Sequence, residues 1–267
     1  MPFTDHDGVR LHWDEQGAGT PVLLVMGATY SSAMWWYAVP TLAEHHRVIR
    51  FDNRGTGESQ STRVATIGDM ASDAVAVMDA AGVDRAHVWG VSLGGVVVIE
   101  LALTHTDRLR SLVVGCSGIL SDDKPRAPKS VNLLAYLPRS VLRRVGRRSG
   151  YGPACPPELA EQDRAVLERD HADRRGLIAQ QDALRAYSVS PERVRRGLTM
   201  PLLVQHGEDD GTVPPAYGKE LADTVPGARH LTYAGAGHNY ILDSAGAATK
   251  DVVAFFDDVD GRAVSGG

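Results

Sequence analysis

The stretch Gly90-Val91-Ser92-Leu93-Gly94-Gly95 decides the fold, because it has the form G-x-S-x-G and separates two apolar segments. The run 86–89 is typical of a buried strand, and 95–104 is apolar almost all round, as in a buried helix. Glycines two residues before and after a serine allow a strand-to-helix turn so tight that the hydroxyl stands clear of the sheet. The helix N-terminus then favours negative charge nearby. A serine in an ordinary glycine-rich turn is the alternative, but this context favours a nucleophile.

Short apolar runs recur on both sides of this turn, with helical patterns between them. The runs cover 22–26, 47–51, 86–89, 112–114, 202–205 and 230–233, and the helical patterns cover 67–81, 95–104 and 245–256. Runs that are rich in β-branched residues and apolar throughout are typical of strands buried on both faces of a parallel sheet. The alternation predicts an α/β fold with a mostly parallel, doubly wound sheet. The alternating stretch 9–13 predicts an antiparallel edge hairpin ahead of it.

The segment 121–196 interrupts this order with several prolines and two predicted helices, around 131–148 and 158–186. We therefore expect one core domain, 1–120 and 197–267, with a helical cap inserted at 121–196. Between 121 and 200 there are 16 Lys or Arg and 10 Asp or Glu, a net of +6, whereas the rest has 12 and 23, a net of −11. Two interpretations stay open: arginine-rich helices facing solvent, or a positive lid that attracts an anionic substrate.

The composition indicates which classes of partner and which compartment to expect. The net charge of −5 favours neither nucleic acid nor an acidic membrane surface. Only two cysteines, Cys116 and Cys155, are present, which suits a reducing compartment. No apolar run is long enough to span a bilayer, and the first residues lack the pattern of a signal peptide. We expect a cytoplasmic protein, a monomer or homodimer, that acts on a small molecule.

A serine nucleophile needs a base, and the base needs an orienting acid. Gly235-Ala236-Gly237-His238-Asn239 places His238 on a glycine-rich loop between the last strand and the last helix, which predicts the base. His206, at a strand end, is its nearest rival and is attributed to packing. Asp209 and Asp210 are the candidates for the acid.

The chain resembles the α/β-hydrolase superfamily, whose members have the order Ser, Asp, His and often show G-x-x-D-x-x-x-P after this strand. Gly207-Glu208-Asp209-Asp210-Gly211-Thr212-Val213-Pro214 has that spacing, and the resemblance selects Asp210. Asp52-Asn53-Arg54-Gly55-Thr56-Gly57-Glu58-Ser59 matches another turn of the superfamily, D-x-R-G-x-G-x-S. It lacks the spacing and the lysine of a P-loop. We expect Asp52 and Arg54 to brace this loop against the nucleophile turn.

An oxyanion hole needs two backbone N–H groups that point at the substrate oxygen. Leu93, the residue after the nucleophile, supplies one. Ala28, in the loop after the first parallel strand, is predicted to supply the other, with Gly27 allowing unusual dihedrals. Many superfamily members have His-Gly where this chain has Met26-Gly27, a difference that leaves main-chain donors intact. Trp35 and Trp36 are candidates for the substrate pocket, with a place in the core as the alternative.

The resemblance covers about two thirds of the chain, on both sides of the cap. Met26-Gly27, the Asp52 turn and 74–88 look like actinobacterial hydrolases of polyketide pathways, in particular anthracycline methylesterases, and 3-oxoadipate enol-lactonases are also similar. The resemblance implies hydrolysis of a carboxylic ester through an acyl-enzyme, without metal or organic cofactor. Cleavage of a lactone, thioester or carbon–carbon bond, and cyclisation, stay open. The serine disfavours epoxide hydrolysis, and the complete triad disfavours a non-catalytic binding protein.

Overall fold

The computed structural model describes residues 2–62, 64–125, 150–170 and 173–265, with side chains as far as 261. Its strands are β1 (Phe3–His6), β2 (Val9–Gln16), β3 (Pro21–Val25), β4 (Arg47–Phe51), β5 (Ala86–Val91), β6 (Leu109–Gly115), β7 (Leu202–Gly207) and β8 (Arg229–Tyr233). Its helices are η1 (Ser32–Trp35), α1 (Ala38–Ala43), α2 (Ile67–Ala80), α3 (Leu93–Thr104), η2 (Thr106–Arg108), α5 (Pro157–Arg169), α6 (Arg174–Ala186), α7 (Pro191–Gly197), α8 (Pro215–Thr224), α9 (Tyr240–Asp243) and α10 (Ala247–Ser265).

The strands form one sheet in the order β1-β2-β4-β3-β5-β6-β7-β8. β1 and β2 pair as an antiparallel hairpin, and β2 pairs antiparallel with β4. All pairs beyond β4 are parallel. The predicted edge hairpin and the mostly parallel α/β sheet are therefore confirmed. Each predicted strand is present, and β5, β6 and β7 extend beyond the apolar runs that identified them.

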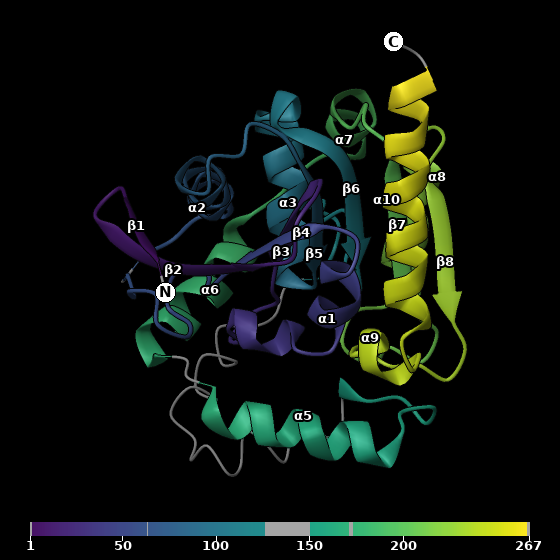
Figure 1. Cartoon of the computed structure of the whole chain (residues 1–267), viewed down its shortest axis with the longest axis horizontal. Coiled ribbons are helices and arrows are strands. Elements are labelled where there is room, and N and C mark those ends of the chain that lie inside the picture. Colours follow the sequence, from purple (N-terminus) through teal and green to yellow (C-terminus); the bar gives the residue numbers. More distant parts are fainter. Residues whose placement is uncertain (1, 63, 126–149, 171–172, 266–267) are drawn as a thin grey trace.

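Helices cover both faces of the sheet (Figure 1), and the buried hydrophobic residues form two clusters, one for each face. One contains buried residues of α2, α3, α7 and α8. The other contains buried residues of α1, α9 and α10. Because α3 lies between the sheet and α2, residues 93–102 are all buried, which explains why its sequence is apolar all round. Within the described residues, no helix combines the length and the apolar character that crossing a membrane requires.

Burial on both faces was a wrong expectation for the last strand. β8 is the outermost strand of the order, and Arg229, Leu231 and Thr232 are exposed along it. Leu231 keeps 37% of its surface accessible. The apolar run at 230–233 thus identifies a strand but not its place at the edge of the sheet, because position in the sheet depends on distant pairing.

The helices of the inserted segment differ from their prediction. The helix expected at 158–186 is two helices, α5 and α6. Asp170 and Asp173 have extended backbones at the break. Their polar groups bind the core instead: the carboxylate of Asp170 accepts from the N–H of Ser31 at 2.9 Å, and the N–H of Asp173 donates to the carbonyl of Gly55 at 3.2 Å. The predicted helix at 131–148 lies outside the described residues.

Figure 1 shows α5 lying across the end of the sheet at which the parallel strands terminate. α7 begins before the predicted boundary at 196 and packs against the core helices α3 and α8. The division into a core and a cap, with those boundaries, stays a prediction.

Candidate active site

Ser92 sits on a strained turn between β5 and α3. Its φ of 55° and ψ of −119° lie in a region that non-glycine residues rarely adopt. A Cβ on Gly90 would lie 2.3 Å from the carbonyl oxygen of Gly94, and a Cβ on Gly94 would lie 2.1 Å from that of Val25. Neither distance is possible between non-bonded atoms, so the predicted need for glycine on both sides of the serine is confirmed.

The structure joins Ser92, His238 and Asp210 in one hydrogen-bonded chain. Nε2 of His238 lies 3.0 Å from Oγ of Ser92, and its Nδ1 lies 2.8 Å from Oδ2 of Asp210. Asp209 is exposed, and its N–H donates to the carbonyl of Ala236. Because a carboxylate only accepts, Nδ1 of His238 carries the hydrogen and Nε2 is left to accept from the serine hydroxyl. The three residues follow β5, β7 and β8, at the carboxyl edge of the sheet.

The surroundings of Asp210 keep it ionised. Its side chain is buried, and Oδ1 accepts from the N–H groups of Thr212 at 2.8 Å and Val213 at 2.9 Å. Burial by itself would raise the pKa of Asp210. Burial is outweighed by hydrogen bonds from His206 and His238, by the charge of His238 and by the N–H of Val213, and the pKa is held well below its ordinary value. A carboxylate at this position can orient the imidazole and stabilise its protonated form.

His206 contacts the acid of the triad, which its sequence position alone did not predict. Its ring is fully buried, and Nε2 lies 3.1 Å from Oδ2 of Asp210 and 3.0 Å from the carbonyl oxygen of Val213. Both neighbours are acceptors, so Nε2 carries the hydrogen. Packing was therefore an incomplete explanation. The sequence did contain a signal for this contact, because His206 lies at the end of β7, only four residues before Asp210.

Cys116 completes the surroundings of Asp210. The ligand-type atoms of Cys116, His206 and Asp210 all lie within 4.8 Å of one another, as in some metal sites. Here Nε2 of His206 is bound to Asp210 and Val213, and burial together with the charge of Asp210 raises the pKa of the Cys116 thiol. A metal ion would also compete with His238 for Asp210. The contacts therefore suit a hydrogen-bonded support for Asp210 rather than a metal centre.

The two predicted oxyanion donors are neighbours in sequence of residues at the turn: Leu93 follows Ser92, and Ala28 follows Gly27, at which a Cβ would contact Ser92. Leu93 is the first residue of α3, so its N–H has no acceptor within the helix. In the described part of the chain, the N–H of Ala28 likewise meets no protein acceptor. The expectation for Gly27 was wrong in its reason. The positive φ of this loop, 73°, is at Thr29 and not at Gly27, where a Cβ would instead make a tight contact, 3.2 Å, with Cβ of Ser92.

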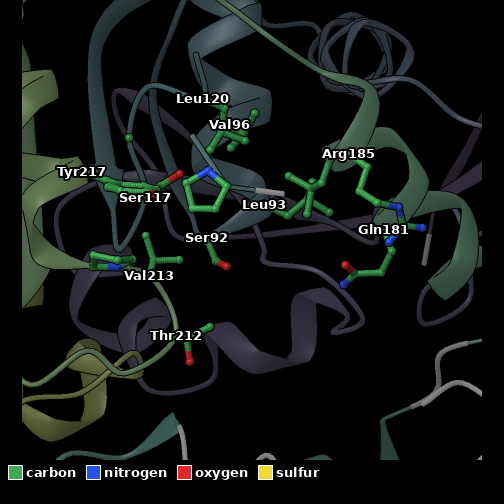
Figure 2. A pocket seen from close by; sticks show the side chains of 14 residues that line it. Ser92, Leu93, Val96, Ser117, Leu120, Gln181, Arg185, Thr212, Val213 and Tyr217 are labelled. Atoms are coloured by element: carbon green, nitrogen blue, oxygen red, sulfur yellow. The ribbon is translucent and has the colours of Figure 1, made fainter. Parts of the chain in front are cut away.

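A pocket of about 400 Å³ opens beside Ser92 (Figure 2). Its lining within the described residues is Ser92, Leu93, Val96, Ser117, Gly118, Leu120, Pro125, Gln181, Leu184, Arg185, Thr212, Val213, Pro214 and Tyr217. Most of these come from α3, from α6 and from the segment after β7. Apart from Ser92 and Leu93, none was predicted as a site residue, and those of α6 could not be, because helical periodicity does not show which face of an inserted helix meets the core.

Neither predicted pocket tryptophan lines this pocket. Trp35 is 1% exposed and packs on Trp89 in the layer beneath α1 and α10, with ring centroids 4.9 Å apart. Trp36 donates from Nε1 to Oδ1 of Asp163 on α5 at 2.8 Å. Trp35 is therefore a core residue, and Trp36 ties the loop after β3 to the inserted segment. From the sequence alone, a tryptophan in either of these positions could not be distinguished from one in a pocket wall.

The inserted segment also holds the loop that carries Ala28. Gln180, fully buried on α6, accepts from the N–H of Thr29 at 2.8 Å and donates to the carbonyl of Arg54 at 3.0 Å. On α5, the carboxylate of Asp163 accepts from Trp36 and from Tyr151, the latter at 2.6 Å. Buried side chains of the insertion thus set the position of the predicted oxyanion loop.

The Asp52 turn braces different elements from those expected. Oδ1 of Asp52 accepts from the N–H and hydroxyl of Ser32, and Oδ2 lies 3.0 Å from Nδ1 of His12. Arg54 forms a buried two-point ion pair with Asp73 of α2, at 2.6 and 2.7 Å. These contacts hold η1, β2 and α2 together. The prediction that Asp52 and Arg54 brace this loop against the nucleophile turn was therefore wrong, because their side chains contact other elements.

Comparison with known proteins agrees with this geometry. The family model for the alpha/beta hydrolase fold matches residues 20–245. A protein named carbamate hydrolase RutD, from Azorhizobium caulinodans, is 32% identical over 86% of this chain and 88% of its own. Rhodomycin D methylesterase DauP, from Streptomyces sp. strain C5, is 29% identical over 83% of this chain and 85% of its own. The crystal structure of an enol-lactonase from Burkholderia xenovorans LB400 matches with a TM-score of 0.83 and 27% identity, covering 96% of this chain and 99% of that one.

The family model spans most of the chain, and the parallel strand order, the serine turn and the order Ser, Asp, His all fit it. The resemblance to methylesterases and enol-lactonases is matched by relatives of both kinds. This chain belongs to the α/β-hydrolase fold family.

Proposed function

We propose that this protein is a serine hydrolase that cleaves a carboxylic ester of a small molecule. The observation that carries the proposal is the chain of contacts from Oγ of Ser92 through His238 to the buried carboxylate of Asp210, at 3.0 and 2.8 Å. A pocket beside Ser92 gives a substrate access to it. Geometry of this kind is what activation of a serine hydroxyl requires.

The reaction follows from these positions. Oγ of Ser92 attacks the ester carbonyl carbon as its proton passes to Nε2 of His238, and the carbonyl oxygen becomes an oxyanion beside the N–H groups of Ala28 and Leu93. The C–O bond then breaks, and the departing alcohol takes the proton from His238, which leaves an acyl-serine. Water next gives a proton to His238 and attacks the acyl carbon. Collapse of this second intermediate returns the proton to Ser92 and releases the acid.

The pocket favours a substrate of modest size. A volume of about 400 Å³ is within the usual range of small-molecule sites, and most of the lining is apolar. The names of the relatives refer to a methyl ester, a carbamate and an enol lactone, all of which present an acyl carbon to a nucleophile. A lactone is a cyclic ester, so two of these three names support an ester substrate. Lactones and thioesters belong in the same substrate panel.

Hydrolysis of p-nitrophenyl butyrate tests the proposal. Ser92→Ala should lower kcat by about 10³-fold or more. Asp210→Asn should lower it by about 10⁴-fold, because the neutral amide no longer holds Nδ1–H toward itself. Asp209→Asn is the matched control, since Asp209 is exposed and its carboxylate has no part in the chain. Turnover by Ser92→Ala at the wild-type rate would contradict the proposal, and equal losses in the two aspartate variants would contradict the choice of Asp210.

A further inference from the structure

Ser117 brings a hydroxyl to the wall of the pocket beside Ser92. It follows Cys116, whose φ of 45° turns the chain at the end of β6, so that Cys116 lies against Asp210 and Ser117 lines the pocket. A Cβ on Gly95 would lie only 2.5 Å from Cβ of Ser117, which places Ser117 against the first turn of α3. The hydroxyl is therefore close to the helix that begins directly after the nucleophile.

The Ser117 hydroxyl has no hydrogen-bond partner in the described part of the chain. Ser117 is 4% exposed, yet none of the described residues forms a hydrogen bond with its Oγ. Buried polar side chains are nearly always hydrogen-bonded, so an exception needs an explanation. Packing against Gly95 requires a small side chain but not a hydroxyl, since alanine would fit the same space. The hydroxyl therefore points to a hydrogen bond with a molecule that enters the pocket.

Tyr217, on α8, supplies a second hydroxyl. A Cβ on Gly118 would lie 3.0 Å from Cβ of Tyr217, so the segment after β6 packs directly on the start of α8. Figure 2 shows Ser117 and Tyr217 together on one side of the pocket, with Ser92 near its middle. The Lys124 ammonium group lies 4.1 Å from the centre of the Tyr217 ring, a contact that a phenylalanine ring could also make. Within the described residues, the Tyr217 hydroxyl likewise has no hydrogen-bond partner.

The charge of the lining indicates which kind of group these two hydroxyls bind. Arg185 is the only charged residue among the lining residues that the structure describes, and it already forms an ion pair with Asp182. Serine and tyrosine hydroxyls are uncharged, and each can donate a hydrogen bond. A carbonyl oxygen has two lone pairs and can accept from both hydroxyls at once. This wall of the pocket therefore suits an uncharged carbonyl oxygen rather than an ion.

Exchange with water explains how the hydroxyls would discriminate between substrates. In the free protein, water can form hydrogen bonds with both of them. An apolar chain that displaces this water leaves the hydroxyls unpaired, at a cost in free energy, whereas a chain with a carbonyl oxygen in the same place restores the hydrogen bonds. The two hydroxyls therefore disfavour a purely apolar substrate in a pocket whose lining is otherwise mostly apolar.

We propose that the hydroxyls of Ser117 and Tyr217 form a subsite for a second, uncharged carbonyl oxygen of the substrate, while the ester carbonyl lies at Ser92. The substrate class is therefore a neutral keto ester, with the ketone in either the acyl or the alcohol part. This inference rests on the proposed esterase function and names the substrate class of that site.

Two pairs of esters, each matched in chain length, test the inference. Methyl 4-oxopentanoate and methyl pentanoate differ by a ketone in the acyl part, and 4-oxopentyl acetate and pentyl acetate differ by a ketone in the alcohol part. Release of acid, followed in a pH-stat, gives kcat/KM for each ester. The wild-type protein should prefer the keto ester of at least one pair by about 10-fold, because each hydrogen bond contributes a factor of a few.

Two variants, Ser117→Ala and Tyr217→Phe, remove one hydroxyl each and keep the packing. Each should lower the preference for that keto ester by about 3- to 10-fold, mostly through KM, and the double variant should abolish the preference. Turnover of the matched apolar ester should change less than about threefold. Ser188→Ala is the control, because Ser188 is exposed and lies outside the described lining of the pocket.

The inference is overturned if the wild type shows no preference within either pair, or if the two variants slow both esters of a pair equally, as a packing role would. It is also overturned if Ser188→Ala lowers the preference as much as Ser117→Ala does. In these cases, continued hydrolysis of the apolar esters leaves the proposed function standing. If none of the four esters is hydrolysed, the inference fails, and the proposed function fails with it when p-nitrophenyl butyrate is also left intact.

Discussion

Nε2 of His206 lies 3.1 Å from Oδ2 of Asp210, the same oxygen that Nδ1 of His238 approaches to 2.8 Å. Two histidines therefore share one carboxylate oxygen, one from β7 and one from the loop after β8. The second donor disperses the charge of Asp210 and fixes its rotamer, since the carboxylate cannot turn without losing both hydrogen bonds. His206 acts on the serine only through Asp210, as a positioning residue.

Removing that donor should change the pH profile of the enzyme. His206→Leu leaves more of the Asp210 charge to interact with protonated His238, so the acidic limb of the kcat/KM profile should move to higher pH, with a loss of about 10-fold at neutral pH. His206→Gln places an amide N–H near the position of Nε2 and should retain most of the wild-type profile. Steady-state kinetics from pH 5 to 9 would measure both. Identical profiles for the leucine and wild-type proteins would contradict this role.

The turn around Ser92 should reject any side chain at Gly94. A methyl group there would lie 2.1 Å from the carbonyl of Val25, so Gly94→Ala must displace β3 or α3. We expect the free energy of unfolding to fall by about 3 kcal/mol, at the upper end of the range for overpacking. Gly211→Ala is the control, because a Cβ at Gly211 meets nothing within 4 Å. Urea unfolding curves compare the two, and equal stability of the variants would show that the turn is less crowded than described.

Gln180 should affect catalysis without touching the substrate. Gln180→Ala leaves the N–H of Thr29 and the carbonyl of Arg54 without their buried partner, which frees the loop that carries Ala28. Because loss of one oxyanion donor typically costs 10²–10³ in rate, a loosened donor should lower kcat by about 10-fold with little change in KM. Gln162→Ala, at an exposed position of α5, provides the comparison. A fall confined to KM would place Gln180 in substrate binding instead.

The buried His87 predicts part of the pH dependence of stability. Its ring accepts from Ser111 at Nδ1 and donates to Asp260 at Nε2, and burial lowers its pKa from 6.5 to about 4. Between pH 6.5 and about pH 4, His87 is protonated in the unfolded chain but not in the folded protein. The contribution of His87 is therefore complete above pH 6.5 and is lost as the pH falls through about 4, by at most about 3 kcal/mol.

Comparison with His87→Gln isolates this contribution, because glutamine does not titrate. The difference in unfolding free energy between the wild type and the variant, measured in urea at pH 7 and pH 4.5, should favour the wild type more at pH 7. A difference that is independent of pH would mean that His87 is protonated to the same extent in both states.

The sequence predicted the parts of the site whose chemistry restricts the local sequence. Ser92 needs glycines around it, and His238 needs a flexible loop in a set position along the chain, so both could be recognised from spacing. Asp210 needed the resemblance to a family, because Asp209 fits the residues equally well. His206 was underestimated because a buried histidine and a hydrogen-bonded one look alike in sequence.

The pocket could not be predicted in the same way. Gln181 and Arg185 come from an insertion whose packing on the core depends on contacts such as those of Gln180 and Asp163, more than a hundred residues away from their partners in sequence. Trp35 was misplaced for a related reason, since a large aromatic side chain suits a core and a pocket wall equally. Local pattern determines the elements, and long-range packing determines which of their faces meet.

The acyl-enzyme is the central claim, and mass spectrometry tests it most directly. Wild-type protein mixed with p-nitrophenyl butyrate and quenched in acid within milliseconds should gain one butyryl group, and peptide mapping should place it on Ser92. Ser92→Ala should gain none, and His238→Asn should accumulate the adduct at least about 10³-fold more slowly. An ester that is hydrolysed while Ser92 stays unmodified, or an adduct on another residue, would contradict the account.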